Sequence, residues 1–324
     1  MPTKPIISVV IETGTRALTD SISVEESVGR HLEEIRKFSK GPEVEVLFVG
    51  AQLPPNSLMQ KNCRCLSLPQ VGYYGWKNAG AKAARGKYIV FWDSDCRPGK
   101  GYLKKAVETL EKNRRLWGVT GISQYDGDTY LTRLNTVLSF GYLYQDEDFT
   151  TGHAALSHNV VIRKSKLPQE PFGPYSYRVG GDFHLTRMAA RAGHPLKLVR
   201  EMRIFHEDPS FSLSALLERH LRGIFEPQLF KPQGSRLEVM ALAFRGVAGM
   251  TKGWIVKVFT YGKRMEFGTF DAILSLPVLM VYSLLDLFVV MVMVLYQPLL
   301  DKLITHHIGS KPGTPSPSPK LDPI

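Results

Sequence analysis

The chain has 324 residues, of which 44% are hydrophobic, so it is long enough for one large α/β domain with an additional segment. Its formal net charge of +11 indicates an anionic partner, such as nucleotide phosphates or a membrane surface rich in acidic lipid. Because the basic residues are spread along the chain and accompany no DNA- or RNA-binding motif, nucleic acid is not an expected partner.

The first part of the chain alternates predicted strands and helices. Residues 6–11 (IISVVI) and 44–49 (VEVLFV) are continuous apolar runs typical of buried strands, and apolar residues recur at helical spacing between them, from Val24 to Phe38. The elements expected next are a short strand near 64–68, a helix over 73–85, a strand at 88–92 and a helix over 101–113. This alternation favours a parallel sheet with helices on both faces.

The cysteines and the N-terminus bear on the compartment of the protein. Cys63, Cys65 and Cys96 form neither a disulfide framework nor a zinc-binding spacing, which favours a reducing compartment. The apolar run near the N-terminus is short and predicts a strand, and it lacks the features of a signal peptide.

Two aspartates follow the strand 88–92 (YIVFW), one residue apart. Asp93 and Asp95 are expected at the carboxyl end of a central strand, beside the crevice where open α/β sheets bind ligands. One interpretation is that either aspartate caps the helix that begins near Tyr102. The other is that the pair converges on a hard divalent cation that also takes phosphate oxygens.

The middle of the chain has a mixed pattern. We expect a strand at 117–123, a helix over 130–144, a strand at 158–163, a helix from Asp182 to Ala192 and a strand at 196–200 that leads into the sequence FHEDPSF.

The composition shifts beyond residue 235. Residues 272–300 hold one charged residue, Asp286, in 29 positions, which predicts a membrane span or hairpin and leaves a buried or oligomer-forming helix as the alternative. The expected organisation is a catalytic domain over 1–235, an amphipathic, interfacial helical region over 236–267, a hydrophobic membrane segment over 268–300 and a disordered tail over 301–324.

Four segments in order resemble the family 2 inverting glycosyltransferases with the GT-A fold. They are ISVVIETGTR (7–16), KNAGAKAARGKYIVFWDSD (77–95), GGDFHLTRMAARAG (180–193) and FHEDPSFS with ERHLRG (205–223). The resemblance implies an α/β, Rossmann-like mixed sheet with helices on both faces, followed by C-terminal hydrophobic helices. The chain departs from the family pattern at Glu12 and Gly14 and at VGAQ (49–52), positions that usually help to hold the base and ribose.

The resemblance also implies roles for the acidic residues. Asp95 is the expected metal ligand, and Asp93 the expected contact to ribose or to a metal-bound water. Asp182 at a helix start is the expected base, and the helix N-terminus would favour its ionised form; simple N-capping is the alternative. Glu12 is a candidate substitute for the missing nucleotide contact.

The remaining candidates are basic or imidazole groups. His206 is a candidate third metal ligand, with Glu207 and Asp208 as rivals. Lys77 is expected to reach a phosphate or the two aspartates, while Arg219 and Arg222 are expected to clamp the diphosphate, with a solvated or headgroup-facing surface as their alternative. We expect Tyr73, Tyr74 and Trp76 to be packing or wall residues, and His153, His158, His184 and His194 to be structural or surface residues.

The predicted function is metal-assisted transfer of a sugar, by single displacement, from a nucleotide-diphosphate sugar such as a UDP-sugar or GDP-sugar to a saccharide or lipid-linked acceptor. Mn²⁺ or Mg²⁺ is the expected cofactor, the membrane is an expected partner with the catalytic domain in the cytoplasm, and an oligomer is compatible with the sequence. The alternatives are a nucleotidyltransferase and a non-catalytic, glycosyltransferase-like membrane scaffold.

Overall fold

The structure is a computed structural model, and it describes residues 5–13, 24–38, 43–50, 54, 59, 61–68, 71–144, 148–151, 156–173, 181–193, 196–207 and 236–295. Asp208, Arg219, Arg222 and the predicted tail lie outside these residues, as do His153 and His194.

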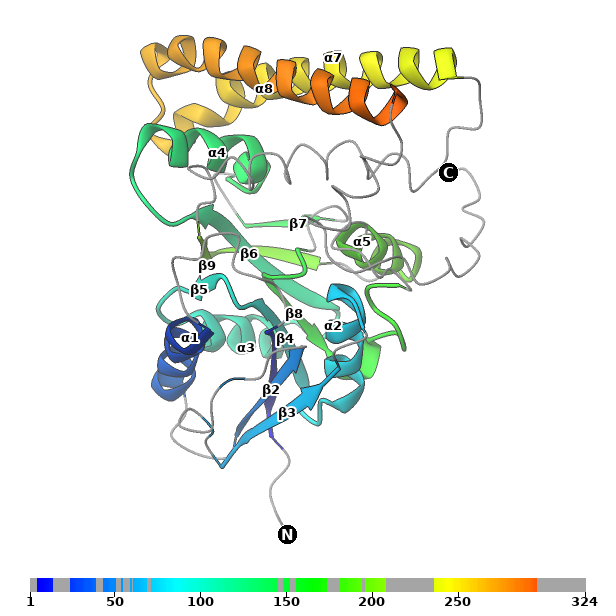
Figure 1. Cartoon of the computed structure of the whole chain (residues 1–324). Helices are drawn as coiled ribbons and strands as arrows, with labels where there is room; N and C mark the ends of the chain where they lie inside the picture. Colours follow the sequence, from blue (N-terminus) through cyan, green and yellow to red (C-terminus); the bar gives the residue numbers. More distant parts are fainter. Residues whose placement is uncertain are drawn as a thin grey trace.

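A nine-stranded sheet forms the centre of the described structure (Figure 1). Its strands are β1 (Ile7–Glu12), β2 (Val44–Gly50), β3 (Cys63–Ser67), β4 (Tyr88–Asp93), β5 (Cys96–Pro98), β6 (Gly118–Tyr125), β7 (Phe149–Thr151), β8 (Val160–Arg163) and β9 (Leu196–His206). They follow the order β3-β2-β1-β4-β8-β6-β9-β5, and β7 pairs with β9.

The sheet is mixed, as the resemblance implies. Strands β3, β2, β1 and β4 are parallel, β8 runs antiparallel between β4 and β6, and β9 is parallel to β6 but antiparallel to β5 and β7. β5 follows β4 after a two-residue turn and yet lies at the far end of the strand order. The sheet therefore curls so that its last strand returns to the end of β4.

Helices cover both faces of the parallel half. α1 (Val24–Phe38) and α3 (Tyr102–Lys112) pack on one face, and α2 (Tyr73–Ala83) and α5 (Gly181–Arg191) pack on the other. Within β4, Val90 and Trp92 belong to the first core and Ile89 and Phe91 to the second. This is why the strand has apolar residues at consecutive positions.

Two long helices, α7 (Arg236–Tyr261) and α8 (Thr269–Leu295), form an antiparallel hairpin that packs against α4 (Tyr130–Phe140), as Figure 1 shows at the top of the view. Short 3-10 turns η2 (Gly141–Leu143), η3 (Lys164–Lys166) and η4 (Gly262–Met265) join neighbouring elements. Helix α8 continues through Pro277, and its residues Thr269–Phe288 are long and apolar enough to cross a membrane, with 28% of the most apolar window buried in the protein.

Two element boundaries differ from the sequence prediction by more than two residues. The helix expected over 130–144 ends at Phe140, where Gly141 begins the turn η2. The strand expected at 196–200 continues to His206, because its second half pairs with β5 and β6. Pairing with residues far away in the sequence leaves no local signal of strand length.

Candidate active site

The two aspartates lie at the turn between β4 and β5. Asp93 is the last residue of β4, and Asp95 directly precedes β5; both side chains are buried. Neither caps helix α3, because its N-cap residue is Gly101, which has a left-handed backbone (φ 78°) and no side-chain capping bond. The capping interpretation of these aspartates is therefore wrong.

Strand pairing brings His206 to this turn. Cys96 of β5 is opposite His206 of β9, and the backbone N–H of Glu207 donates to the carbonyl oxygen of Asp95 (2.9 Å). The Nε2 atom of His206 then lies 3.5 Å from Oδ1 of Asp95. His206 ends a strand, whereas the sequence pattern suggested a loop.

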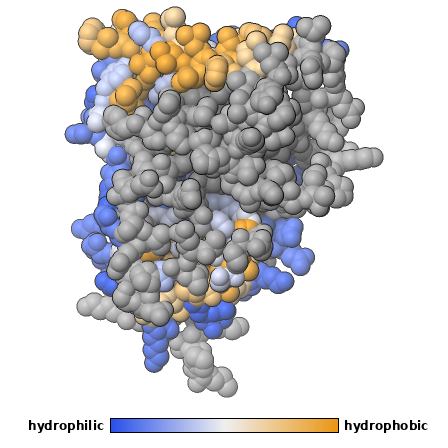
Figure 2. Space-filling model, viewed as in Figure 1, coloured by the Kyte–Doolittle hydropathy of each residue, from blue (hydrophilic) through white to orange (hydrophobic). Residues whose placement is uncertain are grey.

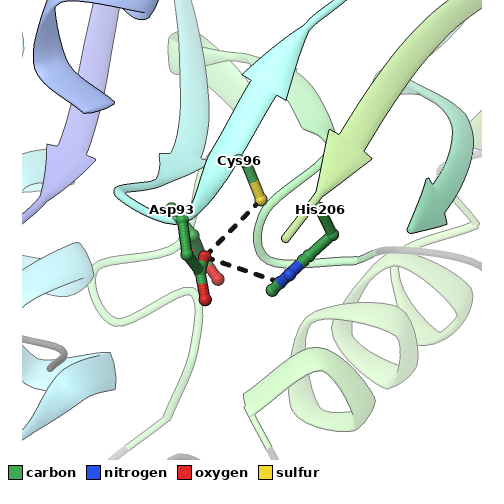
Figure 3. Close-up of side chains that lie close together, drawn as sticks. Asp93, Cys96 and His206 are labelled. Atoms are coloured by element: carbon green, nitrogen blue, oxygen red, sulfur yellow. Dashed lines mark hydrogen bonds and ion pairs between the residues drawn. The ribbon is translucent and has the colours of Figure 1, made fainter. Parts of the chain in front are cut away.

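Four side chains at this point could hold one metal ion. Ligand atoms of Asp93, Asp95, Cys96 and His206 lie within 4.8 Å of one another. Figure 3 shows Asp93, Cys96 and His206 converging, and the Cys96 thiol donates to Oδ1 of Asp95 (3.7 Å). In the described part of the chain this group includes His206 and not its neighbour Glu207. Sequence reasoning missed Cys96 as a donor, although its position directly after the aspartate pair was the available signal.

Asp93 is held from the side of α2. Its carboxylate forms a buried ion pair with the ammonium of Lys77 and accepts from the hydroxyl of Tyr73 (2.7 Å). Burial opposes ionisation of Asp93, but the positive charges around it, Lys77 first, outweigh burial and hold its pKa well below the usual range. Lys77 thus reaches the aspartate pair. Tyr73 packs in the core, as expected, and its hydroxyl is in addition a partner of Asp93.

The other aromatic residues of this helix are packing residues, as expected. The ring of Tyr74 stacks on Phe172 at 5.7 Å, and the indole N–H of Trp76 donates to the carbonyl oxygen of Leu68 (2.8 Å).

Asp182 lies in the first turn of α5, and a glycine sets its position. A Cβ on Gly181 would lie 2.4 Å from the ring of Tyr74, so a residue with a side chain would push the start of α5 away from α2. The Asp182 carboxylate accepts from the backbone N–H of Ser157 (2.6 Å), and the carbonyl of the same Ser157 accepts from Lys77 (2.6 Å). Ser157 therefore links Asp182 to the lysine that holds Asp93.

The protonation behaviour of Asp182 differs from the expectation. Burial raises the pKa of this carboxyl group, and its bond to Ser157 and the charge of Lys77 offset only part of the effect. The helix N-terminus was expected to favour the ionised form, whereas the net shift of the pKa is upward and burial is its largest cause.

His158 lies at the centre of this region. Its Nε2 atom is 3.0 Å from the hydroxyl of Ser123, and its ring meets that of His206 edge-on at 5.2 Å. Burial, followed by the neighbouring His206, lowers the pKa of His158 to about 3, so this ring is neutral at physiological pH. The sequence prediction treated His158 as a structural or surface residue, and no local motif marked its position beside His206.

Glu12 lies beside the aspartate pair. It is the last residue of β1, opposite Asp93 in the parallel register, and its buried carboxylate lies 3.4 Å from the hydroxyl of Ser94. Glu12, Asp93 and Asp95 therefore gather at the carboxyl ends of β1 and β4, where open α/β sheets bind ligands.

Comparisons with known proteins agree with this geometry. The order of strands and the placement of the aspartates define a GT-A-type α/β domain. Residues 53–169 match the family model of glycosyl transferase family 2. This part of the chain is therefore similar to the family 2 glycosyltransferases, in agreement with the resemblance of its motifs.

One curated relative is the Glycosyltransferase AglE of Haloferax volcanii, which is 26% identical over 161 residues. The match covers 47% of this chain and 49% of the relative, so the chain spans about half the length of the curated protein it matches. Among solved structures, GalNAc-T7 with UDP, GalNAc and Mn²⁺ superimposes with a TM-score of 0.46 and 12% identity, over 63% of this chain and 43% of that one.

Proposed function

We propose that the protein is an inverting glycosyltransferase that moves a sugar from a nucleotide-diphosphate sugar to an acceptor hydroxyl. The observation that carries this proposal is the convergence of two groups of residues at one end of the sheet. The candidate metal ligands Asp93, Asp95, Cys96 and His206 form one group, and Asp182 is joined to it through Ser157 and Lys77.

The donor atoms suit a divalent cation. Two carboxylates provide hard oxygen ligands, and an imidazole and a thiol add softer ones, a set that favours Mn²⁺ over Mg²⁺. Asp95 and His206 are the residues proposed to hold the ion, with Asp93 oriented beside them by Lys77 and Tyr73. When bound, the ion supplies positive charge that neutralises the diphosphate leaving group.

Asp182 is the proposed base. Inversion is a single displacement, so the reaction needs one group to take the proton of the acceptor hydroxyl as that oxygen attacks the anomeric carbon. A pKa raised by burial makes the Asp182 carboxylate a stronger base than an exposed aspartate, and the bond from Ser157 keeps it oriented.

The donor nucleotide is proposed to lie along the ends of β1 and β4. Glu12 and Asp93 are the candidate contacts for its base and ribose, because they are neighbours in the parallel register. Arg219 and Arg222, which lie outside the described residues, remain candidates to clamp its diphosphate. A UDP-sugar or a GDP-sugar is compatible with these groups.

A lipid-linked or saccharide acceptor is proposed on the side of α4. Lys257 of α7 donates to the carbonyl of Leu138 (2.7 Å), and two residues further on Phe140 meets His158 edge-on at 5.8 Å. Asp182 is also near enough to Tyr142 for its charge to contribute to raising the pKa of that hydroxyl, after the larger effect of burial. One short segment, 138–142, thus connects the candidate site to the apolar hairpin, which supports an acceptor at a membrane surface. The catalytic domain is proposed on the cytoplasmic side of that membrane.

A donor screen tests the proposal. Full-length protein is incubated with UDP- and GDP-sugars and with polyprenyl phosphate or saccharide acceptors, with Mn²⁺, Mg²⁺ or EDTA, and products are detected by mass spectrometry. We expect a glycosylated product that requires the cation and has the opposite anomeric configuration to the donor by NMR.

Three outcomes would contradict the proposal. Donor binding without any product would favour a non-catalytic scaffold. Formation of a nucleotide sugar from a sugar phosphate and a nucleoside triphosphate would favour a nucleotidyltransferase. A product with retained configuration would exclude the single displacement by way of Asp182.

A further inference from the structure

The hairpin of α7 and α8 exposes a large apolar surface. Figure 2 shows it as a nearly continuous hydrophobic area along one end of the molecule. It is made of aromatic and aliphatic side chains from both helices: Phe244, Ile255, Val256, Phe259, Phe270, Ile273, Leu274, Leu276, Met280, Val281, Leu284 and Phe288. An exposed apolar surface of this extent marks an interaction site.

The opposite face of α8 is occupied by protein along most of the helix. Ala272, Ser275, Leu279, Tyr282 and Asp286 are buried, and their spacing of three and four residues places them on one helical stripe. The stripe packs on α4 and α7. Helix α8 therefore has one covered face and one exposed face over the same residues.

Polar contacts hold α8 along the domain. At its start the Tyr130 hydroxyl donates to the carbonyl of Asp271 (3.0 Å), and further along the Tyr282 hydroxyl donates to the side-chain oxygen of Asn135 (3.2 Å). The hydroxyls of Thr251 and Ser283 join α7 to α8 (2.6 Å). These contacts begin near the first turn of α8 and reach its middle.

This attachment is incompatible with α8 crossing a bilayer. From Asp271 to Ser283, the first and last α8 residues in these contacts, the helix advances about 18 Å, more than half of a hydrocarbon thickness. If this length stood across the membrane, α4 with Arg133, Asn135 and Thr136 would be drawn into the hydrocarbon with it. Burying such groups against lipid is costly, so a spanning helix would have to separate from α4.

We propose that the α7–α8 hairpin lies in the plane of one leaflet of an anionic membrane and does not span it. Its outer face inserts among the acyl chains, and its inner face remains on the protein. The described part of the hairpin exposes the basic residues Arg245, Lys252, Lys263 and Arg264 and only two acidic ones, Glu238 and Glu266. This excess of positive charge, which is part of the net charge of +11, complements acidic headgroups and favours lipid over a second copy of the equally basic chain.

Depth measurements with single tryptophans test the orientation. Phe270, Met280 and Phe288 are 71%, 65% and 62% exposed and span the outer face of α8, so each is replaced by Trp in the full-length protein without disturbing the core. The variants are bound to vesicles that contain lipids brominated at different acyl positions. The signal of the unsubstituted protein, which has four tryptophans of its own, is subtracted. Lys104→Trp on the exposed side of α3 is the control.

An in-plane hairpin predicts that all three tryptophans are quenched at the same shallow depth, about 5–10 Å into the apolar region, and that the control is not quenched. A spanning helix instead separates positions 270 and 288 by about 27 Å and places 280 near the bilayer centre, so graded depths would overturn the proposal.

Binding itself provides a second measurement. We expect vesicles of phosphatidylcholine with about 30% phosphatidylglycerol to bind the protein at least about tenfold more tightly than pure phosphatidylcholine, and Met280→Glu with Leu284→Glu to abolish binding. The proposal would be refuted if the full-length protein formed a dimer in solution, shielded these tryptophans and did not bind vesicles. That result would show that a second copy of the chain covers the apolar face.

Discussion

Cys96 and His206 face each other on the antiparallel strands β5 and β9, and the Asp95 carboxylate lies between them, 3.7 Å from the thiol and 3.5 Å from the imidazole. Two segments that are remote in sequence thus supply adjacent ligand atoms. The arrangement depends on the pairing of β5 with β9. The contribution of each candidate ligand can be tested by substituting that residue alone.

Asp95 is the central acid of this group. We expect Asp95→Asn to lower turnover by about 100-fold or more and to weaken nucleotide binding only when Mn²⁺ is present, because a neutral amide is a poorer ligand for a divalent cation. Calorimetric titration of the nucleotide with and without Mn²⁺ measures this effect.

The matched control is Asp126→Asn, an exposed carboxylate paired with Arg97 that should leave both quantities unchanged. Near-normal activity of Asp95→Asn, or equal loss of binding with and without the cation, would remove the metal role of Asp95.

The candidate role of the Cys96 thiol as a metal ligand predicts how the activity responds to soft metal ions. A thiolate ligand favours Zn²⁺ and Cd²⁺, so Cys96→Ser should weaken inhibition by these ions by about tenfold while Mn²⁺ still supports turnover. The measurement is the concentration of Zn²⁺ that halves the rate at fixed Mn²⁺. Cys63→Ser on the edge strand β3 is the control, since this thiol belongs to no candidate metal group within the described residues. Unchanged Zn²⁺ sensitivity would mean that the Cys96 sulfur is not a ligand.

The proposed role of Asp182 as the base predicts the turnover rate of the Asp182→Asn variant and the pH dependence of activity. Asp182→Asn keeps an oxygen that can accept from Ser157 but cannot take a proton, so kcat should fall by about 100-fold or more with donor affinity largely unchanged. Asp182 acts as a base only when it is ionised, and burial raises its pKa. Activity should therefore be full at high pH and fall as the pH is lowered, with a midpoint above about 3.9, the pKa of an ordinary aspartate.

The thermal stability of the Asp182→Asn variant separates this role from a structural one. An amide avoids the cost of burying a charge, so its melting temperature should match or exceed that of the parent. A lower melting temperature together with lost donor binding would identify Asp182 as a structural residue.

Local patterns predicted much of the fold. Continuous apolar runs located β1, β2 and β4, and helical spacing located α1, because each strand or helix buries its own stripe of side chains. The aspartate pair was found for the same reason: it follows a readily visible strand. The mixed sheet came from the family resemblance, since the direction of β8 depends on partners elsewhere in the chain.

The rest of the site depends on long-range contacts. Nothing near His158 shows that it meets His206, and nothing near Tyr73 shows that its hydroxyl bonds Asp93. The composition of α8 indicated a membrane segment. The proposed in-plane orientation of α8 rests on its packing with α4, and a hydropathy pattern gives no information about such packing.

The buried ion pair of Lys77 and Asp93 should contribute to the stability of the folded protein. Lys77→Met would leave the Asp93 carboxylate buried without its cation and should lower the free energy of unfolding by about 3–5 kcal/mol, measured by urea denaturation. Lys82→Met, an exposed lysine on the same helix, should change it by less than about 0.5 kcal/mol. Adding Asp93→Asn to Lys77→Met removes the unpaired charge, so the double variant should recover part of the loss. A single variant as stable as the Lys82 control would show that Asp93 does not require this partner.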